Sequence, residues 1–181
     1  MPRVPRIAAK AQLPEGQRPI FDAIAVSRGA VGGPFPVLLN SPEVAGRVAH
    51  LGTYLRFESA LTPVQRELAI IATAREWDYA LEWGGHVQLA RREGVREQAI
   101  DVVGRRAPLD TLADAEQLIV RYVRELIGTR RVSPATFAAT HAALGDRGVT
   151  DLTATIGYYG MLACALNAFE VEPAAGAPPL P

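Results

Sequence analysis

The segment from Leu61 to Gly94 constrains the fold most, because helix signals stand at both of its ends. Thr62 and Pro63 have the types expected at an N-cap and a first helical residue, and Gln65 supplies the third member of a capping box. Gly94 is a typical residue just beyond a helix C-terminus. The segment therefore predicts two helices that face each other across a short turn.

The rest of the chain shows the same helical pattern. Its apolar runs are long and Ala-rich, and no sustained period of two indicates a strand. Helices are expected over residues 16–28, 42–59, 63–76, 79–92, 96–103, 112–127, 134–144 and 150–170. Residues 29–41 read as a loop whose Phe35, Val37, Leu38 and Leu39 turn inward. We therefore expect an all-α fold with one domain over 16–170, an N-terminal arm over 1–15 and a Pro-rich tail over 171–181.

Composition excludes several classes of protein. With 181 residues, 49% hydrophobic and 21% charged, the chain can bury a sizeable core, and its formal net charge of zero disfavours nucleic acid or an anionic membrane as partner. No signal peptide and no uncharged apolar run of 18 residues is visible, so we expect a cytoplasmic protein. The single cysteine, Cys164, lies in an apolar helical run and is expected to be buried and inert.

Glu82 and His86 are the first candidates for chemistry. They stand four residues apart, so on a helix they share one face and can touch. A carboxylate next to an imidazole orients the ring and raises its pKa, which suits general acid–base catalysis. The alternative is a helix-surface pair worth about 0.2–0.5 kcal/mol. A shared metal ion ranks well below proton chemistry, because no second ligand pair stands at a recognisable spacing.

Glu67 and Tyr79 extend this set. Glu67 falls among apolar helix positions, where a carboxylate is expensive and its pKa is expected to rise unless it meets a partner. A proton-transfer role and a helix-edge ion pair with Arg66 or Arg75 explain it equally well. Tyr79 lies one turn before Glu82 and is a candidate hydrogen-bond donor.

Four further residues are candidates for substrate binding. Trp83 could wall a ligand pocket, although core packing is the commoner role. Tyr54, which pairs with His50 at helical spacing, could border a pocket, and Arg56 could hold a substrate carboxylate. Asn167 could hydrogen-bond a ligand or cap a neighbouring helix.

At these residues the chain resembles the carboxymuconolactone decarboxylase family, which includes the alkyl hydroperoxide reductase D-type proteins. The resemblance rests on R-E-L-A-I at 66–70, E-W-x-x-H at 82–86 and L-A-R-x-x-G at 89–94, and the final helix YYGMLACALNAF supports it. It covers roughly residues 40–170. It implies an all-α bundle that assembles into trimers or hexamers, with active sites near subunit contacts.

The resemblance also assigns roles. In the peroxidase branch a relay glutamate precedes a CxxC motif and a histidine, and Glu67 and His86 match the glutamate and the histidine. Tyr79 and Glu82 stand where the two cysteines would be, so thiol-based peroxide reduction is not expected at this site. The decarboxylase branch places a glutamate four residues before the histidine, as Glu82 and His86 do.

The sequence therefore predicts a cofactor-free lyase that acts on a small carboxylated lactone or a related aromatic-degradation product. His86 is the expected general acid or base, Glu82 its orienting partner, Glu67 a second proton-transfer group and Tyr79 a donor. An isomerase, hydratase or hydrolase would use the same groups. The remaining alternative is a non-catalytic oligomeric binding protein in which these residues form a buried structural network.

Overall fold

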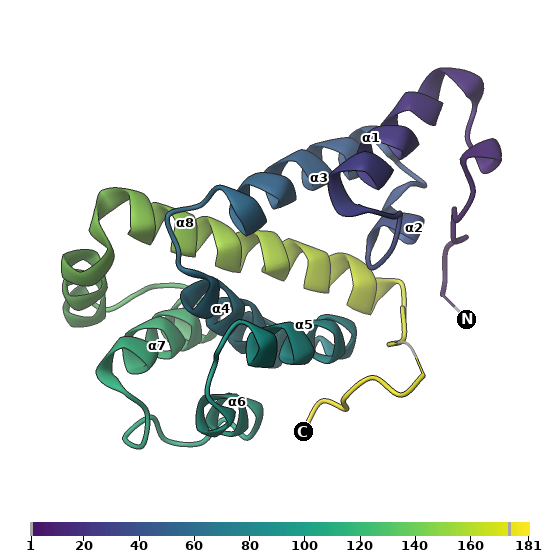
Figure 1. Ribbon diagram of the computed structural model, residues 1–181. Helices are drawn as coiled ribbons and strands as arrows, with labels where there is room; N and C mark the ends of the chain where they lie inside the picture. The colour runs from purple at the N-terminus through teal and green to yellow at the C-terminus, as the bar shows by residue number, and fades with distance from the viewer. Residues whose placement is uncertain (1, 174) are drawn as a thin grey trace. The chain divides into compact units, whose positions relative to one another are not determined.

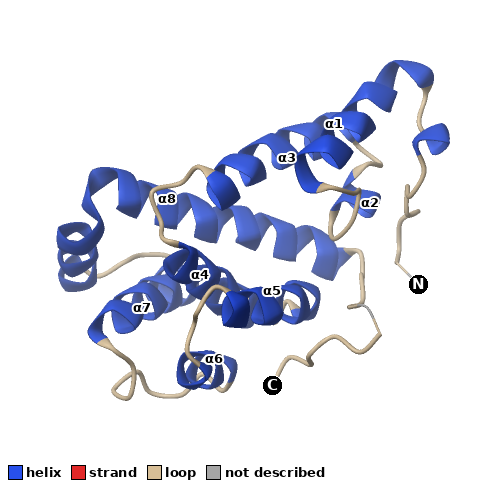
Figure 2. Ribbon diagram, viewed as in Figure 1, coloured by secondary structure: helices blue, strands red, loops and turns tan. Residues whose placement is uncertain are grey.

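The computed structural model describes residues 2–173 and 175–181, and this part of the chain contains helices and no strand (Figures 1 and 2). The expected all-α fold is confirmed. Two 3-10 turns come first, at Lys10–Gln12 and Glu15–Gln17. The helices are α1 (Arg18–Arg28), α2 (Phe35–Leu38), α3 (Pro42–Phe57), α4 (Pro63–Glu76), α5 (Ala80–Arg92), α6 (Glu97–Gly104), α7 (Asp114–Thr129) and α8 (Pro134–Ala168).

The chain divides into two compact units. The first comprises Met1–Glu58 and Cys164–Glu172, and the second comprises Ser59–Ala163 and Pro173–Pro181. The two helices predicted to carry the chemistry, α4 and α5, both belong to the second unit.

In the first unit, α1 packs against α3. The approach is close at Gly46, where an added Cβ would lie 3.2 Å from the Cγ2 of Ile20. The N-terminal arm is held by backbone contacts within this unit: the amide of Ile7 donates to the carbonyl of Pro36 at 2.7 Å. The side chain of Asn40 donates to the carbonyl of Pro5 at 2.8 Å, which fixes the arm at a second point.

The segment expected to be a loop contains a helical turn, α2. Its apolar side chains are buried as expected, with Phe35 and Val37 both 2% exposed. The prediction of a continuous loop is wrong because two prolines, Pro34 and Pro36, preset φ near the helical value instead of only ending helices. Gly29, at φ +78°, ends α1 in the left-handed region that glycine tolerates.

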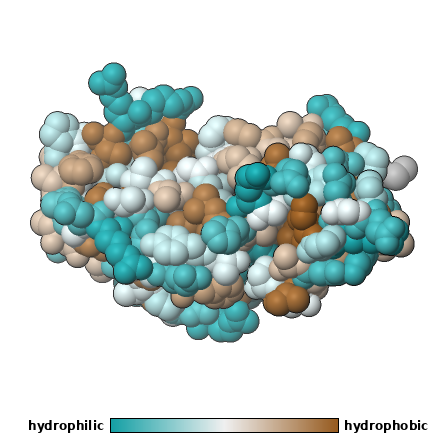
Figure 3. Space-filling model, turned by 90° about the horizontal axis from the view of Figure 1, so that it is seen from above, coloured by the Kyte–Doolittle hydropathy of each residue, from teal (hydrophilic) through white to brown (hydrophobic). Residues whose placement is uncertain are grey.

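Helix α3 begins at Pro42 as predicted, but its apolar stripe is only half buried. Val48 and Leu55 are buried, whereas Val44 and Leu51 are 47% and 44% exposed. Ser41 is the N-cap residue of α3, but its side chain makes no capping hydrogen bond. Apolar side chains reach the surface elsewhere too, as the brown areas of Figure 3 show. The large exposed ones are Val26, Val44, Leu51, Phe57, Trp77, Phe137 and Met161.

In the second unit, α4 is the core helix and packs against α5, α6 and α7. Its residues from Glu67 to Ala74 are all buried. The predicted capping box is confirmed, because the Gln65 amide donates to Thr62 Oγ1 at 3.3 Å and the Thr62 amide donates to Gln65 Oε1 at 2.9 Å. Helix α5 follows after a turn in which Asp78 has a φ of +47°.

Two helix ends differ from those predicted. Helix α7 continues past Gly128 and ends where Arg130 takes a φ of +66°. The two expected last helices are one element, α8, kinked at Gly145 with φ 68° and ψ 179°. A break between two helices was expected there, but the helix resumes directly after Gly145. Thr150 Oγ1 donates to the carbonyl of Asp146 at 2.7 Å, within this second part of α8.

Candidate functional site

The candidate site lies in the second unit, where α4 and α5 face each other. His86 Nδ1 lies 2.7 Å from Glu67 Oε2, and His86 Nε2 lies 2.8 Å from Glu82 Oε1. One imidazole thus bridges two carboxylates, one from each helix. All three residues are buried, with exposures of 3% for Glu67, 6% for His86 and 7% for Glu82.

Helical geometry explains the arrangement. The spacing of four places Glu82 and His86 on one face of α5, so their contact follows from the sequence. The packing of α5 on α4 brings Glu67 to the other ring nitrogen. The capping box at Thr62 fixes where α4 begins and therefore which of its residues face α5.

The two carboxylates control the protonation of His86. Burial lowers the pKa of His86, but the charge of Glu82 and the hydrogen bonds to Glu67 and Glu82 outweigh it and raise the pKa to about 9. Near neutral pH the ring is therefore an imidazolium that donates from both nitrogens. A buried charge is costly unless it is paired and hydrogen-bonded, and here two carboxylates pair with the one imidazolium.

Arg66 adds a second cation beside this group. Its Nε lies 3.5 Å from Glu67 Oε1, and its side chain is 15% exposed. With the imidazolium protonated, two cations face the two carboxylates, and the formal charge of the four side chains is zero. The ion pair between Glu67 and Arg66, one of the two alternatives drawn from the sequence, is therefore present together with the contact to His86.

Tyr79 supplies a hydroxyl at the start of α5. The residue is 1% exposed, and the hydroxyl is buried near the Glu82 carboxylate, whose charge influences the phenol. Burial, followed by the charge of Glu82, raises the pKa of Tyr79 well above its usual value. The phenol therefore stays protonated and can donate.

Two tyrosines of α8 complete the surroundings of the ring. The edge of His86 meets Tyr159, with ring centroids 5.3 Å apart and planes at 80°, and Tyr159 meets Tyr158 in the same way at 5.2 Å. Sequence reasoning did not include Tyr159. The pair Tyr-Tyr in the final helix was visible, but periodicity gives no information about which face of α8 meets α5.

The other predicted residues are divided between the two units. Trp83 is 2% exposed on α5, next to Glu82, and its ring lies against Gly104 of α6. Tyr54 and Arg56 are half-buried on α3, and Asn167 is near the end of α8. These last three belong to the first unit, whereas Trp83 and the three titratable residues of the imidazole group belong to the second.

Cys164 corrects one expectation, because its side chain is exposed rather than buried. It lies on an outward position of α8, which the apolar composition of the surrounding run conceals. Among residues 2–173 and 175–181, no group of three or more His, Cys, Asp and Glu side chains is arranged to hold a metal ion. In the same part of the chain no helix is long and apolar enough to cross a membrane.

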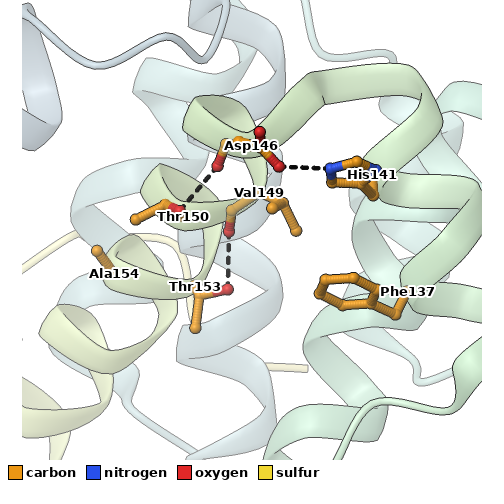
Figure 4. A pocket seen from close by; sticks show the side chains of 7 residues that line it. All are labelled: Phe137, His141, Asp146, Val149, Thr150, Thr153 and Ala154. Carbon is orange, nitrogen blue, oxygen red and sulfur yellow. Dashed lines mark hydrogen bonds and ion pairs between the residues drawn. The ribbon is translucent and has the colours of Figure 1, made fainter.

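Two surface pockets lie away from the imidazole group. One, of about 620 Å³, lies at the kink of α8, where His141 Nε2 contacts Asp146 Oδ1 at 2.7 Å and Phe137 stacks on His141 at 5.9 Å (Figure 4). The other, of about 460 Å³, lies between α1 and α3 and includes His50 and Tyr54. His50 and Tyr54, the pair at helical spacing on α3, both line this pocket.

One comparison with known proteins finds a family match. Residues 42–125 match the model of the carboxymuconolactone decarboxylase family, so the resemblance inferred from the sequence is confirmed. The matched range contains Glu67, Tyr79, Glu82 and His86. No curated protein matches the sequence.

Proposed function

Since the chain carries a carboxymuconolactone decarboxylase family domain, we propose that it is a cofactor-free acid–base lyase. Its proposed substrate is a small carboxylated lactone or a related product of aromatic degradation. The observation that supports this proposal is the imidazole of His86, held between Glu67 and Glu82 at 2.7 and 2.8 Å. This arrangement stores a proton in a buried site at neutral pH.

Decarboxylation needs such a proton. The carbon–carbon bond to the carboxylate breaks, carbon dioxide leaves, and the electron pair enters the conjugated carbonyl as an enolate. Protonation of the enolate at carbon completes the reaction, so a positioned donor must deliver one proton. We assign the proton to His86 and its delivery to Glu82, which is the more exposed of the two carboxylates at 7% against 3%. Solvent restores the proton after each turnover.

Glu67 and Tyr79 have supporting roles in this proposal. Glu67, paired with Arg66, keeps the far nitrogen of His86 hydrogen-bonded, so the ring is held in one orientation. The buried hydroxyl of Tyr79 is a donor suited to the oxygen on which enolate charge develops. Trp83 is proposed to shape the site from within α5. Tyr54, Arg56 and Asn167 belong to the first unit, and no contact with this site is assigned to them.

Turnover of carboxymuconolactone by purified variants tests the proposal. We expect carbon dioxide release by the unmodified chain, and a fall in kcat of about 100-fold or more for His86→Gln and for Glu82→Gln, because general acid–base catalysis contributes about 10²–10⁴-fold. Glu97→Gln, on an exposed ion pair with Arg91, is the matched control and should leave kcat unchanged. Near-normal turnover with both site variants would contradict the assignment.

The burial of the group favours one competing function. Because His86 and both carboxylates are less than 10% exposed, they could serve as a structural network in a non-catalytic binding protein. In that case the same variants would lower the melting temperature. The unmodified chain would turn over no carboxylated lactone, whether by decarboxylation, isomerisation, hydration or hydrolysis. Activity measurements and thermal unfolding of the same samples separate the two functions.

A further inference from the structure

The C-terminal segment lies against α5 and α6 of the second unit. A Cβ added to Gly84 of α5 would lie 2.9 Å from the Cβ of Ala177 and 3.2 Å from the carbonyl oxygen of Pro178. A Cβ added to Gly104 of α6 would lie 2.9 Å from the Cγ of Pro181. Both 2.9 Å distances are shorter than real Cβ atoms show, so a side chain at either glycine would force the segment to shift. Figure 1 shows the end of the chain next to α6.

Trp83 links the two glycines. Its ring lies 3.1 Å from the position of a Cβ on Gly104, so Gly104 accommodates the indole as well as Pro181. The carbonyl of Gly104 accepts a hydrogen bond from Arg75 Nε of α4 at 2.5 Å. Gly84, Gly104 and Trp83 thus form the surface that the C-terminal segment contacts, which we name the tail trough.

The neighbouring glycine shows that this contact is specific. Gly85, one residue along α5, has nothing within 4 Å of an added Cβ. A glycine inside a helix costs about 0.5–1 kcal/mol relative to alanine, so helix propensity disfavours both residues equally. Of these two glycines, only Gly84 has a neighbour close enough to exclude a side chain.

The occupant is suited to the trough. Residues 177–181 read Ala-Pro-Pro-Leu-Pro, and three prolines restrict φ before docking. A restricted segment loses little conformational entropy when it binds, which is why proline-rich peptides dock in grooves lined by aromatic residues. Pro181, the residue beside Trp83 at Gly104, fits this mode of recognition.

We propose that the tail trough is a docking site for a proline-rich segment, that residues 177–181 of the same chain occupy it, and that their docking positions α5 for the acid–base group. Gly84 is two residues from Glu82 and from His86, so it lies on the opposite side of the helix from both. The segment therefore contacts the back of α5, while Glu67 contacts its front through His86. The docked tail is a positioning element and contacts no reacting atom.

Two variants of the full chain test this proposal by NMR. Gly84→Ala should release the tail, and the backbone order parameters of Ala177 and Leu180 should fall from about 0.85 to below about 0.6. Gly85→Ala, the matched control, should leave them unchanged. Both substitutions favour helix, so neither is expected to unfold α5. In Gly84→Ala the pKa of His86 should also fall from about 9 toward the ordinary value of 6.5, because α5 is no longer held in place, and in Gly85→Ala it should not.

Each other outcome overturns part of the proposal. A tail that is flexible in the unmodified chain, or equally rigid in both variants, contradicts docking in the tail trough. Release of the tail with no change in the His86 titration contradicts the positioning role. Order that disappears on dilution would show that the tail of a second copy is the occupant. None of these readouts depends on turnover, so the result stands apart from the proposed decarboxylation.

Discussion

At the scale of single residues, His86 couples protonation to stability. Its pKa is raised from 6.5 to about 9 in the folded protein, so the folded state binds the proton more tightly than the unfolded state. The stabilisation is fully present below pH 6.5 and is lost as pH rises through 9. We expect the free energy of unfolding to fall over this range by up to about 3 kcal/mol, since one pKa unit corresponds to about 1.4 kcal/mol. Urea unfolding at pH 6 and pH 9.5 measures this difference in the free energy of unfolding.

The control for this prediction is His86→Gln, which lacks the titrating ring. The difference between the two proteins should be largest at low pH and shrink as pH rises. Parallel pH dependences in both proteins would rule out His86 as the source.

The two carboxylates should act on His86 as a coupled pair. Glu67→Gln and Glu82→Gln each remove one charge beside the ring, so each should lower the pKa of His86. Because both contact the same imidazole, the double variant should not equal the sum of the single ones. NMR titration of the ring in the three variants gives the coupling, and strict additivity would show that the carboxylates act independently.

The sequence predicts the part of this site that lies along one helix. The contact between Glu82 and His86 follows from a spacing of four residues, and the structure confirms it. Glu67 left two interpretations open, because its partner depends on how α4 and α5 pack. The contact with Tyr159 was not predicted, since it depends on which face of α8 turns toward α5.

At the scale of elements, the kink of α8 depends on one glycine. Gly145 has a φ of +68° and a ψ of 179°, a region that is essentially restricted to glycine and costs other residues about 1–3 kcal/mol. Gly145→Ala should therefore lower the melting temperature by a few degrees, because one kcal/mol shifts it by about 2–4 °C for a chain of this size. Gly157→Ala in the same helix, where an added Cβ meets nothing within 4 Å, should raise it slightly. Scanning calorimetry of both variants measures the two shifts, and equal shifts would contradict the role given to the kink.

Element boundaries were predictable where the signal is chemical and local. The capping box at Thr62 and Gln65 placed the start of α4 at the correct residue. Helix α2 was missed because a four-residue helix has no room for a period, and its two prolines resemble a break. The apolar stripe of α3 is only half buried, because periodicity predicts an apolar face and gives no information on whether the chain itself covers that face.

At the scale of the whole molecule, we propose that the chain forms a homo-oligomer. The exposed apolar side chains of α1 and α3 support this proposal: Val26 is 86% exposed and Phe57 63% exposed. Contiguous apolar patches on a surface typically mark interaction sites. Leu51→Glu, at a position that is 44% exposed, should lower the mass measured by light scattering, whereas Glu43→Gln on the same helix should not. A monomeric mass for the unmodified chain would contradict the proposal.

The central claim is that His86 is held as an imidazolium between Glu67 and Glu82, ready to give up a proton. The ¹⁵N NMR spectrum of the ring in the full chain tests this claim most directly. At pH 7.5 we predict that Nδ1 and Nε2 both carry protons and that deprotonation follows with a pKa near 9. A neutral ring at pH 7.5, with one nitrogen unprotonated, would contradict the claim.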